Sequence, residues 1–146
     1  MTTGIDIRHP GAGDLALVMA VAPGLFDNPL IERQARAFLE SPLNHLVLAY
    51  EAGQAVAFAS GTVLLHPDKP PAMFVNELGT RESHRRRGFG RAVLEALIDR
   101  ARAVGCQGVW LGAETANRKA RALYRASGGK EMLFAGYAWD GAFDDG

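Results

Sequence analysis

The hydrophobic and polar residues of this chain follow two periods, one typical of strands and one typical of helices. Short alternating or apolar stretches predict strands over residues 5–8, 46–50, 55–65, 72–80 and 107–113, and one or two more over residues 132–139. Apolar residues at helical spacing predict helices over residues 15–22, 28–39 and 88–104. Consecutive strands followed by a helix and a further strand predict an α+β fold, with helices on the faces of a mixed, mostly antiparallel sheet.

Turn and cap residues predict where these elements begin and end. Pro23 and Gly24 end the first helix, and Asn28 with Pro29 predicts the cap and first turn of the second. Gly53 predicts a tight turn that joins two strands into a hairpin. The strand, helix and strand between residues 72 and 113 predict a parallel crossover. The acidic segment 141–146 predicts a mobile tail.

The length and composition limit the architecture and the partners. With 146 residues and 48% hydrophobic side chains, residues 1–146 suit one compact domain. The 16 basic and 16 acidic side chains cancel, which argues against a global field that would hold nucleic acid or an anionic membrane. No apolar run approaches the roughly 20 residues that span a bilayer. Neither a disulfide partner for Cys106 nor a signal segment is present, so we expect a cytoplasmic protein.

An arginine- and glycine-rich turn between a predicted strand and a predicted helix is the strongest functional signal. Its sequence is Arg85-Arg86-Arg87-Gly88-Phe89-Gly90. The first amides of a helix lack intrahelical partners, so a turn of this kind can cradle a phosphate. The plain alternative is a flexible, solvated connection. The turn lacks the third glycine of a dinucleotide fingerprint and the Lys-Ser/Thr of a P-loop.

The turn resembles the acetyl-CoA signature of the GNAT superfamily of N-acetyltransferases, with Arg85, Gly88 and Gly90 at the signature positions. Residues 117–128 resemble the second cofactor segment of the same family through Asn117, Ala120, Leu123, Tyr124 and Ala126-Ser127-Gly128. Smaller features resemble the aminoglycoside 3-N-acetyltransferase branch: Phe26-Asp27, Glu77-Leu78, His84-Arg85-Arg86, and Tyr137 with Asp140. The resemblance implies the GNAT fold, with about four helices around the sheet.

The resemblance also implies a set of residues that bind acetyl-CoA as co-substrate. Backbone groups of Leu78 and Thr80 would bond its pantetheine arm, and Asn117 would contribute a side-chain amide. Gly79 is expected to mark a bulge that frees an N–H for the oxyanion. The expected cofactor-binding residues are Leu78, Gly79, Thr80, Arg85, Arg86, Arg87, Gly88, Phe89, Gly90, Arg91, Asn117 and Arg121.

Two residues are candidates for the acid–base chemistry of acetyl transfer. By resemblance, Tyr124 donates its proton to the leaving thiolate, and a phenol suits that task. Its alternative is an ordinary half-buried tyrosine. Glu77 either removes the proton of the ammonium or only holds a cation, and its alternative is an exposed strand carboxylate. Glu114 and Asp140 join Glu77 as expected acceptor-binding acids, and Asp27 enters only through the finer resemblance.

Other chemistry is less well supported by the sequence. A nucleophilic Cys106 lacks a nearby histidine, and His9, His45 and His66 show no metal-ligand spacing, so no metal is expected. A nucleic-acid contact would use the basic residues Arg81, Arg85, Arg86, Arg87 and Arg91, but the net charge of zero counts against it.

The sequence therefore predicts an enzyme that transfers an acetyl group from acetyl-CoA to a primary amine by direct attack in a ternary complex. The expected acceptor is a small cationic molecule, aminoglycoside-like or polyamine-like. The alternatives are a protein lysine or N-terminal acetyltransferase and a non-catalytic module that senses acyl-CoA. The family resemblance also allows a homodimer.

Overall fold

The computed structural model describes residues 4–141. Its elements are β1 (Asp6–Arg8), η1 (Ala12–Asp14), α1 (Leu15–Met19), α2 (Glu32–Glu40), β2 (Asn44–Glu51), β3 (Gln54–Leu64), β4 (Ala72–Thr80), η2 (Glu82–His84), α3 (Phe89–Ala103), β5 (Val109–Trp110) and α4 (Arg118–Ala126). The chain divides into two compact units, one ending at Glu114 and the other beginning at Thr115. Their assignment to a single domain stays a prediction.

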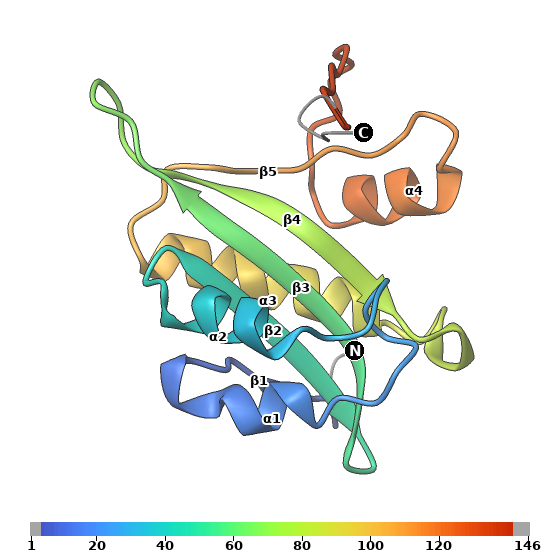
Figure 1. Cartoon of the computed structure of the whole chain (residues 1–146). Coiled ribbons are helices and arrows are strands. Elements are labelled where there is room, and N and C mark those ends of the chain that lie inside the picture. Colours follow the sequence, from blue (N-terminus) through green and yellow to red (C-terminus); the bar gives the residue numbers. More distant parts are fainter. Residues whose placement is uncertain (1–3, 142–146) are drawn as a thin grey trace. The chain divides into compact units, whose positions relative to one another are not determined.

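The first unit is built on a five-stranded sheet in the order β1-β2-β3-β4-β5 (Figure 1). Neighbouring strands are antiparallel except β4 and β5, which are parallel and joined through α3. The mixed, mostly antiparallel sheet and the parallel crossover are confirmed. The β2–β3 turn has positive φ at both Ala52 and Gly53, which matches the strand twist of a tight hairpin.

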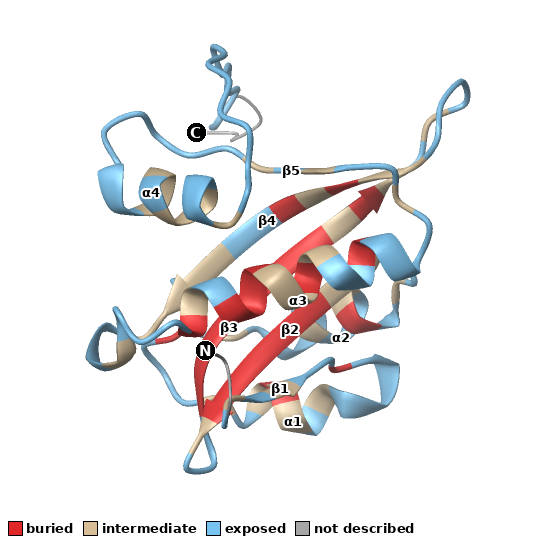
Figure 2. Ribbon diagram, turned by 180° about the vertical axis from the view of Figure 1, so that it is seen from behind, coloured by how far each residue is buried: buried red, intermediate tan, exposed pale blue. Residues whose placement is uncertain are grey.

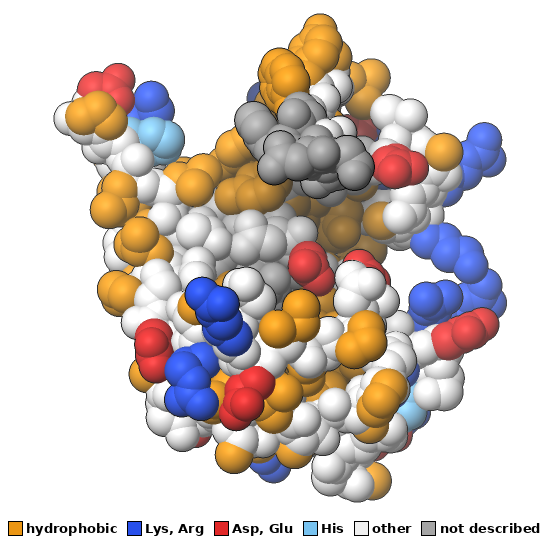
Figure 3. All heavy atoms as spheres, in the orientation of Figure 1, with side chains coloured by type: hydrophobic (Ala, Val, Ile, Leu, Met, Phe, Trp, Pro, Cys, Tyr) orange, Lys and Arg blue, Asp and Glu red, His pale blue; other side chains and the backbone are white. Residues whose placement is uncertain are grey.

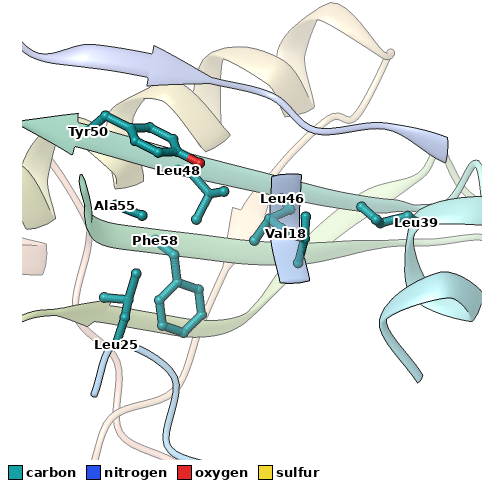
Figure 4. Close-up of a cluster of buried hydrophobic side chains, with 8 residues drawn as sticks. All are labelled: Val18, Leu25, Leu39, Leu46, Leu48, Tyr50, Ala55 and Phe58. Carbon is teal, nitrogen blue, oxygen red and sulfur yellow. The ribbon is translucent and has the colours of Figure 1, made fainter. Parts of the chain in front are cut away.

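Both faces of β2 and β3 are buried, which explains why these strands read as continuous apolar runs (Figure 2). One face packs against α3. The other face packs against α1, the following loop and α2 (Figure 1). The core on that side consists of Val18, Leu25, Leu39, Leu46, Leu48, Tyr50, Ala55 and Phe58 (Figure 4).

The register between β3 and β4 decides which groups of β4 remain available. The Arg81 N–H donates to the Val56 carbonyl at 2.8 Å, and Gly79 lies opposite Phe58. Because antiparallel bonding alternates, the backbone groups of Gly79 face β3, whereas those of Leu78 and Thr80 face away from it. On that far side β5 pairs only with Met73 and Phe74. The edge of β4 is therefore open beside Leu78 and Thr80.

The irregularity in β4 lies at Asn76, so the predicted bulge at Gly79 is wrong. Glu77 pairs with Ser60 and Val75 pairs with Gly61, which leaves Asn76 as the extra residue. Gly79 is needed for a different reason. A Cβ there would lie 2.7 Å from Cε1 of Phe58, which is closer than real contacts allow. A glycine therefore lets the Phe58 ring cover β4.

Several predicted boundaries need correction. The first helix ends at Met19, and the second begins at Glu32 instead of Asn28, with the extended Ile31 as its N-cap residue. β5 has only two residues, since few of residues 107–113 pair with β4.

Residues 129–139 contain no strand, although strands were predicted over 132–139. Their large apolar side chains are 65–82% exposed. A strand forms only beside a partner strand, and the composition of a segment does not show whether such a partner is present. The predicted tail lies outside the described residues except for Gly141.

Two histidines beside Arg100 predict the pH dependence of stability. Partial burial, followed by the Arg100 charge, lowers the pKa of both His9 and His45 in the folded chain. The unfolded chain therefore binds more protons below about pH 6.5, and the unfolding free energy should fall as the pH drops through that range. Thermal unfolding of His45→Gln between about pH 8 and 5 should show a weaker pH dependence than the unsubstituted chain.

The matched control is His66→Gln, because His66 lies in the loop between β3 and β4. It should keep the pH dependence of the unsubstituted chain. Identical pH profiles for His45→Gln and His66→Gln would contradict the assignment.

Candidate functional site

A pocket of about 550 Å³ opens on the face of the sheet that carries α1 and α2. Its floor is formed by side chains of β2 and β3, one wall by α2 and the other by the loop between α1 and α2. The apolar lining residues are Val18, Phe26, Pro29, Leu30, Ile31, Ala35, Ala37, Phe38, Leu39, Leu46 and Phe58. This pocket can hold the apolar body of a small molecule.

The charged side chains of the pocket are both acidic. Glu77 reaches it from β4, because Glu77 pairs with Ser60, which also lines the pocket. Asp27 reaches it from the loop after α1. The uncharged polar side chains are Asn28, Gln34, Asn44 and Ser60, and no lysine, arginine or histidine is among the lining residues. The pocket therefore favours a cation.

The open edge of β4 lies directly beside Glu77, the β4 residue that lines the pocket. Glu77 points to the pocket, while the next residue, Leu78, and then Thr80 direct their backbone groups to the edge that β5 does not cover. A ligand with amide groups could bond there as an added strand does. The predicted contribution of Gly79 does not fit this geometry, since its own N–H faces β3.

The anion cradle predicted at the N-terminus of α3 stays a prediction, and the local geometry is compatible with it. Gly88 caps the helix with φ of 87°, and a Cβ placed there would meet no atom within 4 Å. The N–H groups of Phe89, Gly90 and Arg91 precede the first helical bond, from Ala92 to the Gly88 carbonyl. Open space beside three free amides fits a phosphate.

The arginines of the turn divide into paired and unpaired groups. Arg87 donates to both carboxylate oxygens of Glu51, with 3.0 Å between Nη1 and Oε1, and this bond lowers the pKa of Glu51. Arg91 pairs with Glu95 at 2.7 Å. Within residues 4–141, Arg85 and Arg86 have no ion pair, so they are the side chains free to meet an anion.

Arg86 has an unusual backbone conformation for its residue type. Its φ is 65°, a region where a Cβ is unfavourable and glycine is the usual residue. Such strain is often found where function uses the side chain. The guanidinium of Arg86 is therefore the best candidate for direct contact with a bound phosphate.

The second unit contains α4 and the segment after it. Asn117 caps α4 through its Oδ1, which accepts from the Ala120 N–H at 3.1 Å, so its amide NH2 remains as a donor for a ligand. Arg121 donates to both oxygens of Glu131, at 3.1 and 2.8 Å, and to the Thr115 carbonyl at 2.7 Å. The predicted phosphate contact of Arg121 would have to compete with this pairing.

Tyr124 lies on α4, in the turn before its C-cap. The Gly129 N–H donates to the Tyr124 carbonyl, and the Gly128 N–H donates to that of Arg125, which is the bonding of a Schellman motif. Gly128 has φ of 95°, so the motif explains the glycine in this segment. Burial raises the pKa of Tyr124, and its phenol therefore keeps its proton at neutral pH.

The structure brings together part of the predicted site. Glu77, the open β4 edge and the α3 N-terminus all belong to the first unit, while Asn117, Arg121, Tyr124 and Asp140 belong to the second. Glu114 lies four residues beyond β5 and is exposed, as is Asp140.

Most of the pocket wall at residues 28–35 was not predicted, because a loop and the start of a helix carry no motif. On the face seen in Figure 3, basic side chains gather at one edge, with acidic side chains beside them and elsewhere on the face. Among residues 4–141, no group of three or more histidine, cysteine or acidic residues could hold a metal ion. None of the described helices has the length and hydropathy needed to cross a bilayer.

Comparison with known proteins adds a family and a fold. The model of the acetyltransferase (GNAT) family matches residues 18–128. An aminoglycoside acetyltransferase, HMB0005, from an uncultured soil metagenomic sample is similar in structure, with a TM-score of 0.80 and 22% identity over 93% of this chain and 98% of that one. No curated protein sequence matches the chain.

Two further solved structures show the same fold. AAC(6')-Iy in complex with the bisubstrate analogue CoA-S-monomethyl-acetylneamine has a TM-score of 0.77 and 17% identity, over 93% of this chain and 97% of that one. A ribosomal-protein-alanine N-acetyltransferase from Brucella melitensis biovar Abortus 2308 has a TM-score of 0.72 and 19% identity, over 92% and 98%.

The conformation of Arg86 predicts an uncommon combination of effects for Arg86→Gly. Glycine relieves the positive φ, so the unfolding free energy should stay level or rise by up to about 1 kcal/mol. Loss of the guanidinium should weaken binding of coenzyme A by about tenfold at low salt, with a smaller difference at high salt. Calorimetric titration and thermal unfolding measure the two effects.

Arg102→Ala is the matched control, because Arg102 pairs with Asp99 near the far end of α3. It should leave affinity for coenzyme A unchanged. Unaltered affinity in Arg86→Gly would show that this side chain does not contact the phosphates.

Proposed function

The chain belongs to the GNAT acetyltransferase family, and from this premise we propose that it transfers an acetyl group from acetyl-CoA to a primary amine of a small cationic acceptor. The amine attacks directly, in a ternary complex, and no acyl-enzyme forms. Cys106, the one cysteine, has its pKa raised by burial, which disfavours the thiolate that an acyl-enzyme would need. Action in the cytoplasm and a homodimer are further parts of this proposal.

The observation that carries the proposal is the pocket beside β4. It joins two carboxylates, Asp27 and Glu77, to a mainly apolar lining without a basic side chain. An ammonium group would be attracted there, and a phosphate or carboxylate would be repelled. A cationic amine is therefore the acceptor that best suits the pocket.

The residues present suit acetyl-CoA at the adjoining strand and helix. The free amides of α3 and the unpaired Arg85 and Arg86 would hold its phosphates. The open edge of β4 at Leu78 and Thr80 would bond the pantetheine amides. The co-substrate supplies an acetyl thioester, and a free N–H of this edge would stabilise the developing oxyanion.

Proton transfer falls to two side chains. An amine must lose its ammonium proton before it attacks, and Glu77 is the carboxylate on the strand that also offers the oxyanion N–H. Tyr124 would donate its phenolic proton to the leaving thiolate. A phenol is protonated near neutral pH and can therefore donate to the leaving sulfur.

The solved structures give two acceptor classes to compare. One neighbour is in complex with a CoA–acetylneamine analogue, and another structure, meta-AAC0020, holds sisomicin. These support an aminoglycoside-like or polyamine-like acceptor. A ribosomal-protein-alanine N-acetyltransferase has the same fold, which keeps a protein N-terminus or lysine as the second candidate. A sensor of acyl-CoA without turnover is the third.

The test is acetyl-CoA-dependent thiol release with neamine, spermidine, an alkylamine, a lysine peptide and an alanine-initiated peptide. Release with neamine or spermidine is expected, and Tyr124→Phe should lower kcat by about 100-fold because the thiolate loses its proton donor. Tyr50→Phe is the matched control: Tyr50 is a core residue with Arg8 over its ring, and kcat should not change.

The outcomes separate the candidate functions. Thiol release with the peptides alone would indicate that the acceptor is a protein amine. Tight binding of acetyl-CoA without release by any amine would favour the sensor.

The acidic pocket predicts a specific kinetic effect of Asp27→Asn. With one of two carboxylates removed, KM for the cationic amine should rise by about tenfold, and KM for acetyl-CoA should change little. The difference should shrink at high salt, since Asp27 is exposed. Asp68→Asn, in the loop after β3, is the control of equal charge. An acceptor KM that Asp27→Asn leaves unaltered would remove Asp27 from the site.

A further inference from the structure

Arg81 is bonded to three separate backbone carbonyls. Its Nε donates to Ala55 at 2.8 Å, its Nη1 to Pro23 at 2.9 Å and its Nη2 to Ala22 at 2.8 Å. Its own N–H donates to Val56. Each nitrogen of the guanidinium therefore serves a different acceptor. A lysine also has three donors, but they share one nitrogen and lack the planar spread of the guanidinium. These bonds also leave Arg81 unsuited to the nucleic-acid contact considered from the sequence.

The bonds of Arg81 join the end of β4 to two other segments. Ala55 begins the buried part of β3, and Ala22 and Pro23 lie between α1 and the loop that forms the pocket wall. The α1 helix has already ended at Met19, so these two carbonyls lie beyond its helical hydrogen bonds. The guanidinium of Arg81 thus donates hydrogen bonds to two carbonyls that lie outside the helical hydrogen bonds of α1.

The loop that follows Ala22 and Pro23 makes close contacts with Arg81, β3 and β4. Gly24 has φ of 102°, and a Cβ there would lie 3.3 Å from Nη1 of Arg81. The carbonyl of the next residue, Leu25, lies 3.4 Å from the position of a Cβ on Gly79. Phe26 then packs on Phe58, with ring centroids 4.4 Å apart. The chain reaches the pocket at Asp27 directly after these contacts.

We propose that Arg81 is a positioning residue for the amine acceptor: by fixing the backbone at Ala22 and Pro23, it holds Asp27 in the pocket that Glu77 also lines. The inference rests on the proposed function for the identity of the acceptor. Arg81 also follows Thr80, whose backbone groups lie at the open β4 edge. The side chain of Arg81 therefore ties the wall of the acceptor pocket to the end of β4, while the backbone groups of Leu78 and Thr80 do not depend on it.

The test compares Arg81→Met and Arg81→Lys with the unsubstituted chain, and Arg102→Met serves as control. In both Arg81 variants, KM for the amine that proves active should rise by about tenfold or more, while KM for acetyl-CoA stays within about twofold. Hydrogen exchange of backbone amides in residues 24–31 should become about tenfold faster without any substrate. Arg102→Met should change neither quantity.

Defined results would overturn the proposal. Unchanged hydrogen exchange in residues 24–31 of Arg81→Met would show that the loop does not depend on the hydrogen bonds of Arg81. Unsubstituted behaviour of Arg81→Lys would show that a charge suffices without the three bonds. An equal rise of both KM values would indicate a general structural role. If Arg81→Met does not fold, the exchange measurement on Arg81→Lys, which keeps the charge but not the three bonds, decides the proposal.

Failure of the proposed function gives a different result. If the unsubstituted chain releases no thiol with any amine of the panel, the acetyltransferase proposal fails. In that case the exchange measurement still decides whether Arg81 fixes the loop.

Discussion

The register between β3 and β4 is the constraint on which the rest of the site depends. It directs Glu77 to the pocket face, places Gly79 beneath the Phe58 ring and leaves Leu78 and Thr80 with backbone groups at an uncovered edge. A shift by one residue would turn Glu77 to the opposite face of the sheet. The extra residue at Asn76 confines the irregularity to one position, so the register beyond it is well determined.

Acidic partners limit the positive charge available around α3 and α4. Arg87, Arg91 and Arg121 are each engaged by a glutamate. The sequence predicts all of them as ligands for an anion, but within residues 4–141 Arg85 and Arg86 are the arginines of the turn that have no ion pair, so they and the backbone amides are the remaining candidates for that task. Amides fixed by a helix need no reorientation when an anion arrives, and they add no net charge that would attract nucleic acid.

Elements with a strong period could be predicted closely, and features that depend on tertiary contacts could not. β4 spans the predicted residues 72–80, and α3 differs by one residue at each end from 88–104. By contrast, Asn28 and Pro29 fit a helix start, yet no helix begins there, and these residues line the pocket instead. The anion cradle followed from a motif. The three carbonyls bound by Arg81 lie 26 to 59 residues away in sequence, where no local pattern predicts them.

The turn between β2 and β3 has a consequence for protein engineering. Ala52 and Gly53 are exposed, and such a tip normally tolerates an inserted tag or a circular permutation. Here Glu51 comes directly before the turn and is bonded to Arg87, with His84 Nε2 3.4 Å from its carboxylate. An insertion would transmit any displacement of Glu51 to the turn that precedes α3. The loop at residues 65–71, whose backbone is not tied to that turn, is the better place for a fluorescent or affinity label.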